Sequence, residues 1–251
     1  MGVFRTWAAA DSSESRPDKV AERVARQIVN DVIDQNLEPG SVLMGEAQML
    51  EQYDVSRASL REALRVLEVY GLLSIKPGPG GGPIVREVSS ADVARTLSFY
   101  FHLSGTSLKE VLEARQFIEP VIARLAASAY HDEEAVRALR EAVDREVVDE
   151  NRTGKWQFSD LHSVLIGISD NRVVSLFGDS LRFLFNDRLG SRWVPERDQK
   201  AIHDEHVNIA AAVLDKDPDA AEQLMKNHIA TFTRVSLSRI PGLLEDVLDW
   251  R

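Results

Sequence analysis

The sequence predicts a mainly α-helical protein in two parts, a small helical unit that ends in a β-hairpin and a larger all-helical bundle. Apolar residues recur at helical spacing from Asp18 onward. The glycine- and proline-rich tract Pro77–Pro83 stands between two short apolar runs, which is typical of a hairpin. The chain has 251 residues, of which 44% are hydrophobic and 28% charged, so it can bury a core in two domains.

Three helices are expected before the hairpin. In chain order they cover residues 18–36, Glu46–Tyr53 and 57–70. Ser56 suits the N-cap of the third helix, and Gly71 suits its C-terminal end. The side of this helix that we expect to be buried carries Leu60, Ala63, Leu67 and Tyr70.

The hairpin is expected to pair Leu72–Lys76 with residues 84–86, and every strong segment after it has helical spacing. The expected later helices are 90–102, 108–128, 132–149, 155–169, 172–188, 197–216, 218–239 and 242–250. We therefore expect four regions, which are a loose leader (1–16), a winged helix-turn-helix unit (17–88), a linker helix (89–106) and a helical domain (107–251).

Composition excludes several classes of protein. With no cysteine, the chain has no disulfide scaffold, thiolate metal site or cysteine nucleophile. No run approaches the roughly 18 apolar residues that cross a bilayer, and Met1–Arg16 lacks the apolar stretch of a signal peptide. We expect a cytoplasmic protein with no membrane partner. The net charge of −10 argues against a protein that coats nucleic acid non-specifically.

The third helix has the features of a helix that reads DNA. Arg57, Arg61 and Arg65 are four residues apart and share one face, opposite the apolar side. Ser56 and Ser59 lie at the helix start, where hydroxyls and free backbone N–H groups reach phosphate. Such a helix can enter the major groove, where arginine bonds guanine through two atoms. The hairpin would place Lys76 and the backbone of Gly78–Gly82 beside the flanking groove.

An arginine stripe is more often a solvated face, and residues 17–88 carry eight basic against eleven acidic residues. That balance counts against DNA. Four of the eight basic residues, however, lie between Arg57 and Lys76, the stretch expected to face a duplex. The glycine tract lacks the Gly-Lys-Ser/Thr ending of a phosphate loop, which favours a wing.

One long ordered motif resembles the winged-helix domain of GntR-family bacterial transcription regulators. It consists of Glu38-Pro39-Gly40-Ser41-Val42-Leu43, Glu46 with Met49-Leu50, Val55-Ser56-Arg57-Ala58-Ser59-Leu60-Arg61-Glu62-Ala63-Leu64, and Leu67-Glu68-x-x-Gly71-Leu72. The resemblance implies that Ser56, Arg57, Ser59 and Arg61 contact an operator and that Gly78 lies in the wing. Family members often have arginine directly after the Glu46 position. Here Ala47 stands there, so we expect one operator contact to be missing.

Three of the six histidines, His162, His206 and His228, fall in separate amphipathic helices beside apolar neighbours. Three converging neutral imidazoles would bind Zn²⁺ or another divalent metal. A half-buried histidine is more often a satisfied core residue, so the residues alone leave both possibilities open.

The helical part resembles the FadR-type effector and dimerisation domain, often called FCD. The resemblance runs through Glu113-Ala114-Arg115-x-x-Ile118-Glu119-Pro120, through Glu205-His206 and through Met225-Lys226-Asn227-His228-Ile229. It implies that the three histidines bind metal. The family's fourth ligand is an aspartate one turn before the first histidine, where this chain has Phe158. Either three histidines hold the metal together with water or effector, or the site has lost its metal. Phe158 would make the pocket more apolar, which suits an effector with a hydrocarbon portion.

Arg115 lies on a helix whose other face, with Leu112, Ile118 and Val121, is expected to be buried. An inward arginine needs an anion. Glu119 at i+4 is one candidate. A carboxylate effector is the other, and the resemblance favours it.

These features predict a ligand-responsive DNA-binding transcription regulator and not an enzyme. We expect a homodimeric repressor that binds a palindromic double-stranded operator and leaves it when a small carboxylate or acyl effector binds the helical domain. One alternative is a metal-dependent hydrolase built on the three histidines, although no carboxylate stands out beside them as a general base. A second alternative is a helical scaffold whose winged helix binds protein.

Overall fold

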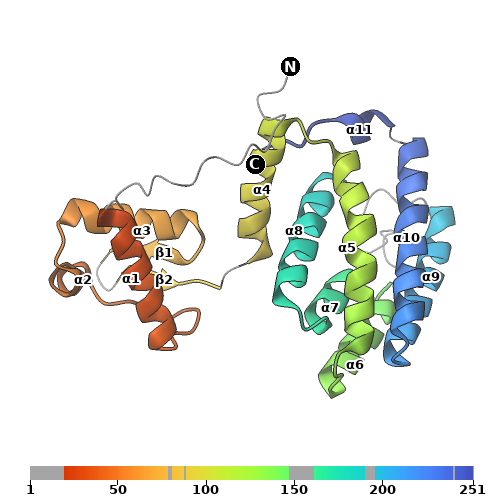
Figure 1. Cartoon of the computed structure of the whole chain (residues 1–251), viewed down its shortest axis with the longest axis horizontal. Coiled ribbons are helices and arrows are strands. Elements are labelled where there is room, and N and C mark those ends of the chain that lie inside the picture. The colour runs from red at the N-terminus through yellow and green to blue at the C-terminus, as the bar shows by residue number, and fades with distance from the viewer. Residues whose placement is uncertain are drawn as a thin grey trace, which may run out of the picture. The chain divides into compact units, whose positions relative to one another are not determined.

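The computed structural model describes residues 20–78, 81–87, 89–146, 161–189, 196–239 and 241–250. The chain divides into two compact units, with the boundary between Asp92 and Val93. Helices make up most of the described chain, and a two-stranded antiparallel sheet follows the first three of them (Figure 1). The predicted fold class is therefore confirmed. The predicted leader at residues 1–16 lies outside the described residues.

The N-terminal unit is built from three helices and a hairpin. Its elements are α1 (Val20–Asp34), α2 (Glu46–Tyr53), α3 (Arg57–Val69), β1 (Leu73–Lys76) and β2 (Gly82–Val85). The apolar faces of α1 and α3 pack together, so that Ile28 and Leu60 are fully buried. In the hairpin, Leu73 pairs with Val85 and Lys76 pairs with Gly82. The hairpin therefore closes two residues earlier along its second strand than the sequence predicts.

Side-chain bonds fix the angles between these helices. The Asp31 carboxylate on α1 accepts hydrogen bonds from Gln52 Nε2 at 2.8 Å and Tyr53 Oη at 2.6 Å, which ties α2 to α1. Asp54 then turns the chain in the left-handed region, with φ of 47°. Ser56 caps α3 by accepting a bond from the Ser59 backbone N–H at 3.2 Å, as predicted. α2 and α3 are thereby held as a helix-turn-helix pair.

The prediction that Tyr70 is buried is wrong, because its side chain is 70% exposed. Tyr70 is the C-cap residue of α3, with ψ of 1°, so it lies where the helical phase ends. Gly71 follows in the left-handed region with φ of 78° and turns the chain into β1. Leu67, which still lies within the last regular turn of α3, remains on the buried face of the helix.

The C-terminal unit is a helical bundle. Its helices are α4 (Ser90–Ser104), α5 (Leu108–Ser128), α6 (Glu133–Asp144), α7 (Leu161–Ile168), α8 (Arg172–Leu189), α9 (Glu196–Leu214), α10 (Pro218–Arg239) and α11 (Pro241–Glu245). α5 lies at the centre and packs against α7, α8, α9 and α10 (Figure 1). It can do so because apolar residues cover much of its circumference, among them Leu112, Ile122 and Ala126.

Several helices of the bundle begin at a side-chain cap. Ser107 accepts from the Glu110 N–H at 3.3 Å, Asp132 accepts from Ala135 at 2.8 Å, and Asp217 accepts from Ala220 at 3.0 Å. The last of these starts α10 at Pro218, as the sequence predicts. α6 ends at Asp144 rather than at 149, and residues 155–160 of the next predicted helix lie outside the described residues.

The prediction that Val121 is buried is also wrong. It is 41% exposed, because it shares the outer stripe of α5 with Phe117, which is 77% exposed. Leu112 is buried as expected, and Ile118 is partly buried. Arg115 is buried on the same inner face as Leu112 rather than on the opposite one, because residues three apart share a helix face.

The end of the chain is an extended strap rather than the predicted helix over 242–250. Only Pro241–Glu245 is helical. Val247 then forms a β-bridge with Ser107, and the Leu248 N–H donates to the Thr106 carbonyl at 3.0 Å. Leu248 inserts its side chain beside Leu108 and is 3% exposed. This buried anchor and the extended backbone bonds are incompatible with continuing the helix. Trp250 packs edge-on against Phe99 of α4, with ring centroids 5.2 Å apart.

Among the helices of the described ranges, none has the length and apolar character required to span a lipid bilayer.

Candidate functional site

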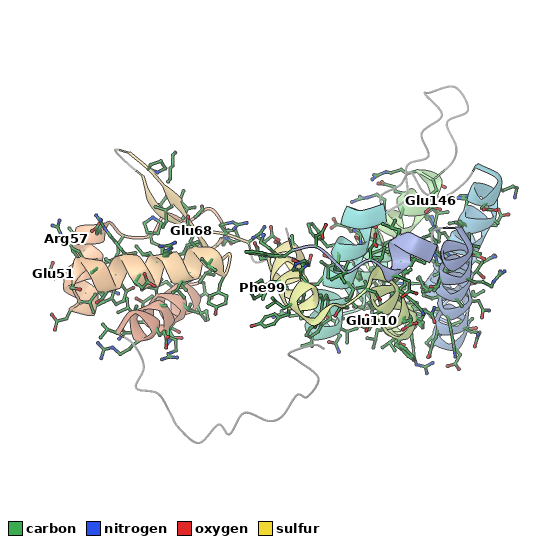
Figure 2. The ribbon with its side chains drawn as sticks, turned by 90° about the horizontal axis from the view of Figure 1, so that it is seen from above. Glu51, Arg57, Glu68, Phe99, Glu110 and Glu146 are labelled. Atoms are coloured by element: carbon green, nitrogen blue, oxygen red, sulfur yellow. The ribbon has the colours of Figure 1, made fainter. Side chains whose placement is uncertain are left out.

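The predicted reading face of α3 is open to solvent. Arg57, Arg61 and Arg65 are all exposed, while Leu60, Ala63 and Leu67 on the opposite side are buried. Arg57 lies at the N-terminal end of the helix and Glu68 near its C-terminal end (Figure 2). Because the first backbone N–H groups of a helix point out along its axis, this end offers both N–H donors and guanidinium groups to an anion.

Within the described part of the chain, Arg61 has one ion-pair partner on this face. Its Nε lies 3.4 Å from Oε1 of Glu46 at the start of α2, and the two side chains are 70% and 42% exposed. Solvent screening limits such a pair to about 0–1 kcal/mol. The guanidinium is therefore free to exchange this partner for a phosphate or a base at little cost. Ser56 and Ser59 lie beside it, with their hydroxyl oxygens 3.0 Å apart.

The wing needs glycine at two positions. Gly78 has φ of 97°, a region that side chains disfavour. A Cβ on Gly81 would lie 2.2 Å from the Lys76 carbonyl oxygen, so only glycine fits against that backbone. The Lys76 side chain at the end of β1 is exposed. The described part of the hairpin thus presents the Lys76 ammonium group and, at Gly78 and Gly81, backbone that no side chain covers.

The three predicted histidines converge inside the bundle. His162 comes from α7, His206 from α9 and His228 from α10, and one nitrogen of each lies within 4.8 Å of the others. The Nε2 atoms of His206 and His228 are 3.2 Å apart. The His162 ring centroid lies 5.3 Å from that of His206 and 5.4 Å from that of His228. His206 and His228 are buried, and His162 is nearly so.

A glutamate contacts the outer nitrogen of each histidine. Nδ1 of His162 is hydrogen-bonded to Glu119 Oε2 from α5, and Nδ1 of His206 to Glu146 Oε1 after α6. Nδ1 of His228 lies 2.7 Å from Glu205 Oε2 on α9. Glu146 is fully buried, and its second oxygen lies 3.3 Å from Nδ1 of His203. Glu146 is labelled in Figure 2.

Burial controls the protonation of this cluster. Desolvation lowers the pKa of His162, although attraction to Glu119 partly offsets it. Desolvation, reinforced by His206 and His162, lowers the pKa of His228 well below its usual value. Burial alone would raise the pKa of Glu119, but attraction to Arg115 and then to His162 outweighs it and the pKa is lowered. The result at neutral pH is an ionised Glu119 beside the neutral imidazoles of His162 and His228.

Arg115 shares Glu119 with His162. Its Nε donates to Glu119 Oε1, and its guanidinium carbon lies 4.2 Å from the ring centroid of Phe185 on α8. The structure therefore contains the ion pair between Arg115 and Glu119, which is one of the two anion partners that the sequence offers. Among the residues that the structure describes, however, the two terminal Nη groups of Arg115 have no hydrogen-bond partner, although the side chain is 6% exposed. A buried guanidinium with unused donors is suited to an anion.

The donor set fits a divalent metal. Because ionised Glu119 accepts a hydrogen bond from the Nδ1–H of His162, that imidazole presents the lone pair of Nε2. If His206 and His228 are oriented in the same way, their close Nε2 atoms both carry lone pairs and repel each other unless a cation lies between them. The three carboxylates, when ionised, and Arg115 give the buried group a formal charge of −2. Three imidazole nitrogens and an excess of two negative charges suit Zn²⁺ or a similar ion.

From the sequence, no carboxylate stands out beside the histidines as a general base, and the glutamates on their outer nitrogens were not predicted. The structure places Glu119, Glu146 and Glu205 against the Nδ1 atoms of the three histidines. Glu205 precedes His206 directly, and Glu119 was considered only as a partner of Arg115. Nothing in the local sequence marks Glu146, which is 60 residues from His206. Phe158, the predicted lining residue of the effector pocket, lies outside the described residues.

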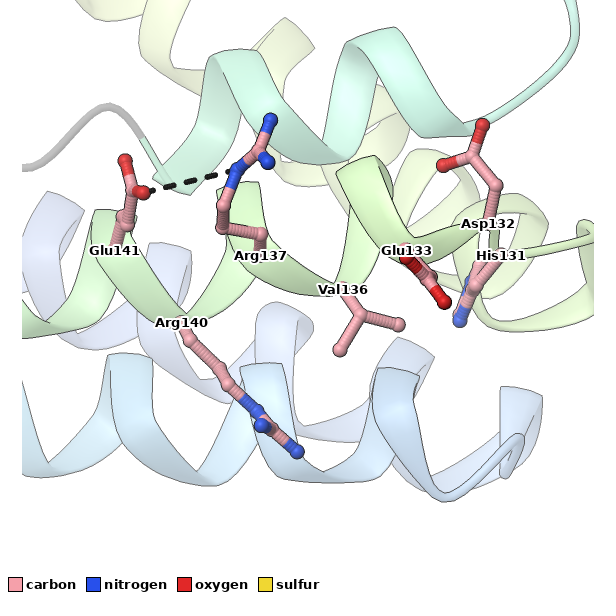
Figure 3. Close-up of a pocket in the computed structure, with 7 residues that line it drawn as sticks. All are labelled: His131, Asp132, Glu133, Val136, Arg137, Arg140 and Glu141. Atoms are coloured by element: carbon pink, nitrogen blue, oxygen red, sulfur yellow. Dashed lines mark ion pairs between the residues drawn. The ribbon is translucent and has the colours of Figure 1, made fainter.

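An open groove of about 370 Å³ on the outside of α6 carries none of the predicted site residues. It is lined by His131, Asp132, Glu133, Val136, Arg137, Arg140 and Glu141. Figure 3 shows the ion pair that Arg137 forms with Glu141 at 3.8 Å.

Two known families match the chain. The family described as bacterial regulatory proteins, gntR family, matches residues 20–81, and the FCD domain matches residues 110–231. An uncharacterised HTH-type transcriptional regulator, Rv0494 of Mycobacterium tuberculosis, is 30% identical over 220 residues, which is 85% of this chain and 88% of that protein. The HTH-type transcriptional repressor NanR of Salmonella newport is 26% identical over 252 residues, covering 91% and 93% of the two chains.

Solved structures include a similar fold. A GntR protein of Streptococcus agalactiae superimposes with a TM-score of 0.65 at 22% identity, covering 86% of this chain and 99% of that one. At this identity the likeness concerns the fold. The helix-turn-helix unit with its hairpin and the helical bundle therefore occur together in a known protein.

Proposed function

The chain belongs to the GntR family of bacterial regulatory proteins and carries an FCD domain, so it is a DNA-binding transcription regulator rather than an enzyme, and we propose that it is a repressor released from its operator by a small carboxylate or acyl effector. One observation carries this proposal. The same chain has an exposed arginine helix and, in its other unit, a buried cluster of three histidines beside Arg115, whose terminal Nη groups point to an anionic ligand. The relative named as the repressor NanR supports the sign of regulation.

The DNA contacts are proposed for six residues, which are Ser56, Arg57, Ser59, Arg61, Lys76 and Gly78. The N-terminal end of α3 enters the major groove, where Arg57 and Arg61 reach base edges. The serine hydroxyls, Lys76 and the wing backbone at Gly78 bind phosphates and so fix the register. Ala47 offers no guanidinium beside Glu46, so one base or phosphate contact of the family is missing here, and the operator is proposed to depart from the commonest family sequence.

The effector site is proposed around Arg115 and the histidine cluster. His162, His206 and His228 would hold Zn²⁺ or another divalent metal. When bound, that metal supplies positive charge for an anionic ligand. The Nη groups of Arg115, buried beside Phe185, supply two further donors for a carboxylate. Phe158 is proposed to line the same pocket and to favour an effector with a hydrocarbon portion.

A homodimer is proposed to bind a palindromic operator. The outer stripe of α5 exposes Phe117 and Val121, and α8, which crosses α5 where Gly178 packs on Ile122, exposes Val173, Leu176 and Phe177. Adjacent exposed apolar residues of this kind favour self-association. Two copies related by a two-fold axis would present two reading helices to two half-sites. Effector binding then favours an arrangement of the dimer in which the helices no longer match the half-site spacing.

A binding assay on the full chain tests this function. Fluorescence anisotropy with fragments of the chain's own promoter should reveal sequence-selective, salt-sensitive binding. The double variant Arg57→Ala/Arg61→Ala should bind at least about 10-fold more weakly, because each guanine contact contributes about 1–3 kcal/mol. The control is Arg137→Ala/Arg140→Ala, which removes two exposed arginines from α6. Full duplex binding by the α3 variant would refute the assignment and favour a winged helix that binds protein.

The effector is sought in the same assay. Small carboxylic acids with and without a hydrocarbon portion are added with Zn²⁺, and the released fraction of DNA is measured. The expected active compound weakens operator binding by the wild type and has no effect on Arg115→Gln. Equal release of the variant would place the effector elsewhere.

A further inference from the structure

We infer that Glu119, Glu146 and Glu205 are positioning residues, which hold the three imidazoles with Nδ1 protonated and Nε2 aimed at one shared divalent cation. The inference deepens the proposed function and rests on its metal site. It concerns residues that would not touch the metal themselves. The affinity of the site for metal would therefore depend on an outer layer of glutamates as well as on the histidines.

The contacts repeat in a way that independent packing does not explain. In each of the three histidines, Nδ1 faces a glutamate oxygen and the rest of the ring faces the other histidines. The three glutamates come from α5, from the turn after α6 and from α9, so no single helix imposes the pattern. They are 43, 60 and 23 residues from their histidines.

The chemistry of imidazole gives this pattern its meaning. A neutral imidazole has one N–H and one lone pair, and an ionised carboxylate only accepts. A carboxylate at Nδ1 therefore selects the tautomer whose Nε2 lone pair is available. Metal-ligating histidines almost always donate their second N–H to such a partner, which also makes the imidazole more basic. Charge balance adds a second reason, because the three glutamates, when ionised, and Arg115 together carry a formal charge of −2, which matches a divalent ion.

Glu146 is the most informative of the three. Its side chain is wholly buried, and its two oxygens face Nδ1 of His206 and of His203. Water cannot replace it there without reorganisation. Glu205 is 36% exposed, so solvent can partly replace its oxygen at His228. Changes at Glu146 should therefore weaken metal binding more than changes at Glu205.

The test uses the full chain and Zn²⁺ in competition with a chelator. Glu146→Leu removes both acceptor oxygens, and Glu146→Gln keeps one acceptor but loses the charge. We expect the affinity for Zn²⁺ to fall about 10- to 100-fold in the leucine variant, with the glutamine variant between it and the wild type. Glu134→Gln, an exposed carboxylate on α6, is the matched control and should bind like the wild type.

A second readout does not require metal. Long-range ¹H–¹⁵N NMR correlations of the chelator-treated wild type report which ring nitrogen carries the proton. Without a cation between them, one of the two close Nε2 atoms must donate to the other, and we expect His228 to donate because its partner Glu205 is the more exposed glutamate. His206 should then stay in the Nδ1–H form, with a larger share of its Nε2–H form in Glu146→Leu. A wild-type His206 in the Nε2–H form would overturn the inference.

The outcomes separate the inference from the function on which it rests. A wild type that binds no divalent metal would refute the proposed metal site. Metal binding by the wild type with unchanged affinity in folded Glu146→Leu and Glu205→Gln would leave that site in place and refute the positioning role. If Glu146→Leu does not fold, the Zn²⁺ affinities of Glu146→Gln and Glu205→Gln decide the question. Both variants keep the size of the glutamate side chain and one acceptor oxygen, so they are expected to fold.

Discussion

Replacing Gly71 with alanine should destabilise the DNA-reading unit for two separable reasons. Gly71 has φ of 78°, where a side chain is disfavoured. In addition, a Cβ at this position would lie 2.6 Å from Cγ of Asp92 at the start of α4. Asp92 is buried and accepts a hydrogen bond from Ser89 Oγ at 2.8 Å, so its carboxylate cannot simply turn away.

The size of the effect follows from these two causes. Placing alanine in the left-handed region costs about 1–2 kcal/mol. Moving the carboxylate weakens the bond from Ser89 and the neighbouring charge interaction with Arg86 at 3.9 Å, for about another 1 kcal/mol. The free energy of unfolding of this unit should therefore fall by about 2–3 kcal/mol, which is about a 30- to 150-fold change in the unfolding equilibrium.

Hydrogen exchange of the backbone amides in α1 and α3 measures this unit directly. Gly40→Ala is the matched control, because Gly40 also has positive φ, 94°, but nothing lies within 4 Å of the added Cβ. Exchange should accelerate more in Gly71→Ala than in Gly40→Ala, by about fivefold. Removing the carboxylate with Asp92→Ala should abolish that difference. Equal acceleration in the two glycine variants would refute the steric part of the reasoning.

Three further predictions concern protons, the strap and the wing. The free energy of unfolding should fall as pH drops below about 6.5, because burial lowers the pKa of His228 and the unfolded chain then binds more protons than the folded one. It should fall again below about 4.5, because Glu119 takes up a proton in the unfolded chain while its lowered pKa keeps it ionised in the fold. Urea titrations from about pH 8 to 3 check both. Constant stability across this range would contradict the burial of a neutral imidazole. Leu248→Ala should destabilise the bundle by about 2–4 kcal/mol, because Leu248 is buried, and Val247→Ala by under about 1 kcal/mol, because Val247 is half-exposed. Thermal unfolding measures both, and equal effects would show that Leu248 does not anchor the strap. Lys76→Ala should weaken binding to all duplexes alike and reduce the slope of log affinity against log salt concentration by about 1. A loss of affinity for one operator sequence alone would instead show that Lys76 contacts a base.

Much of the site was predictable where one helix carries the whole pattern. The reading face of α3 needed only the spacing of Arg57, Arg61 and Arg65 against Leu60 and Leu67, because residues four apart share a face of any helix. Tyr70 shows the limit of this reasoning. It fits the same period, but the helix has ended there, and the period no longer says which way the side chain points.

The histidine cluster was predictable only in part. Amphipathic spacing placed His162, His206 and His228 on helices, and the family resemblance suggested that they meet. Neither gave the glutamates, because an acidic residue at the end of α6, such as Glu146, looks like any solvated helix end until the neighbouring helices cover it. Burial of a carboxylate is a property of several packed elements together.

By itself the sequence determined the helices, their caps, the hairpin and the family, since these depend on neighbours within a few residues or on an ordered motif. The tertiary structure decided which polar groups meet at distances of tens of residues. It brought Glu119 between Arg115 and His162, it buried Glu146 against two imidazoles, and it drew the last residues of the chain into an extended strap instead of a helix. The physical reason is that desolvation and paired charges depend on what surrounds a group in space, and sequence spacing records only the surroundings along the chain.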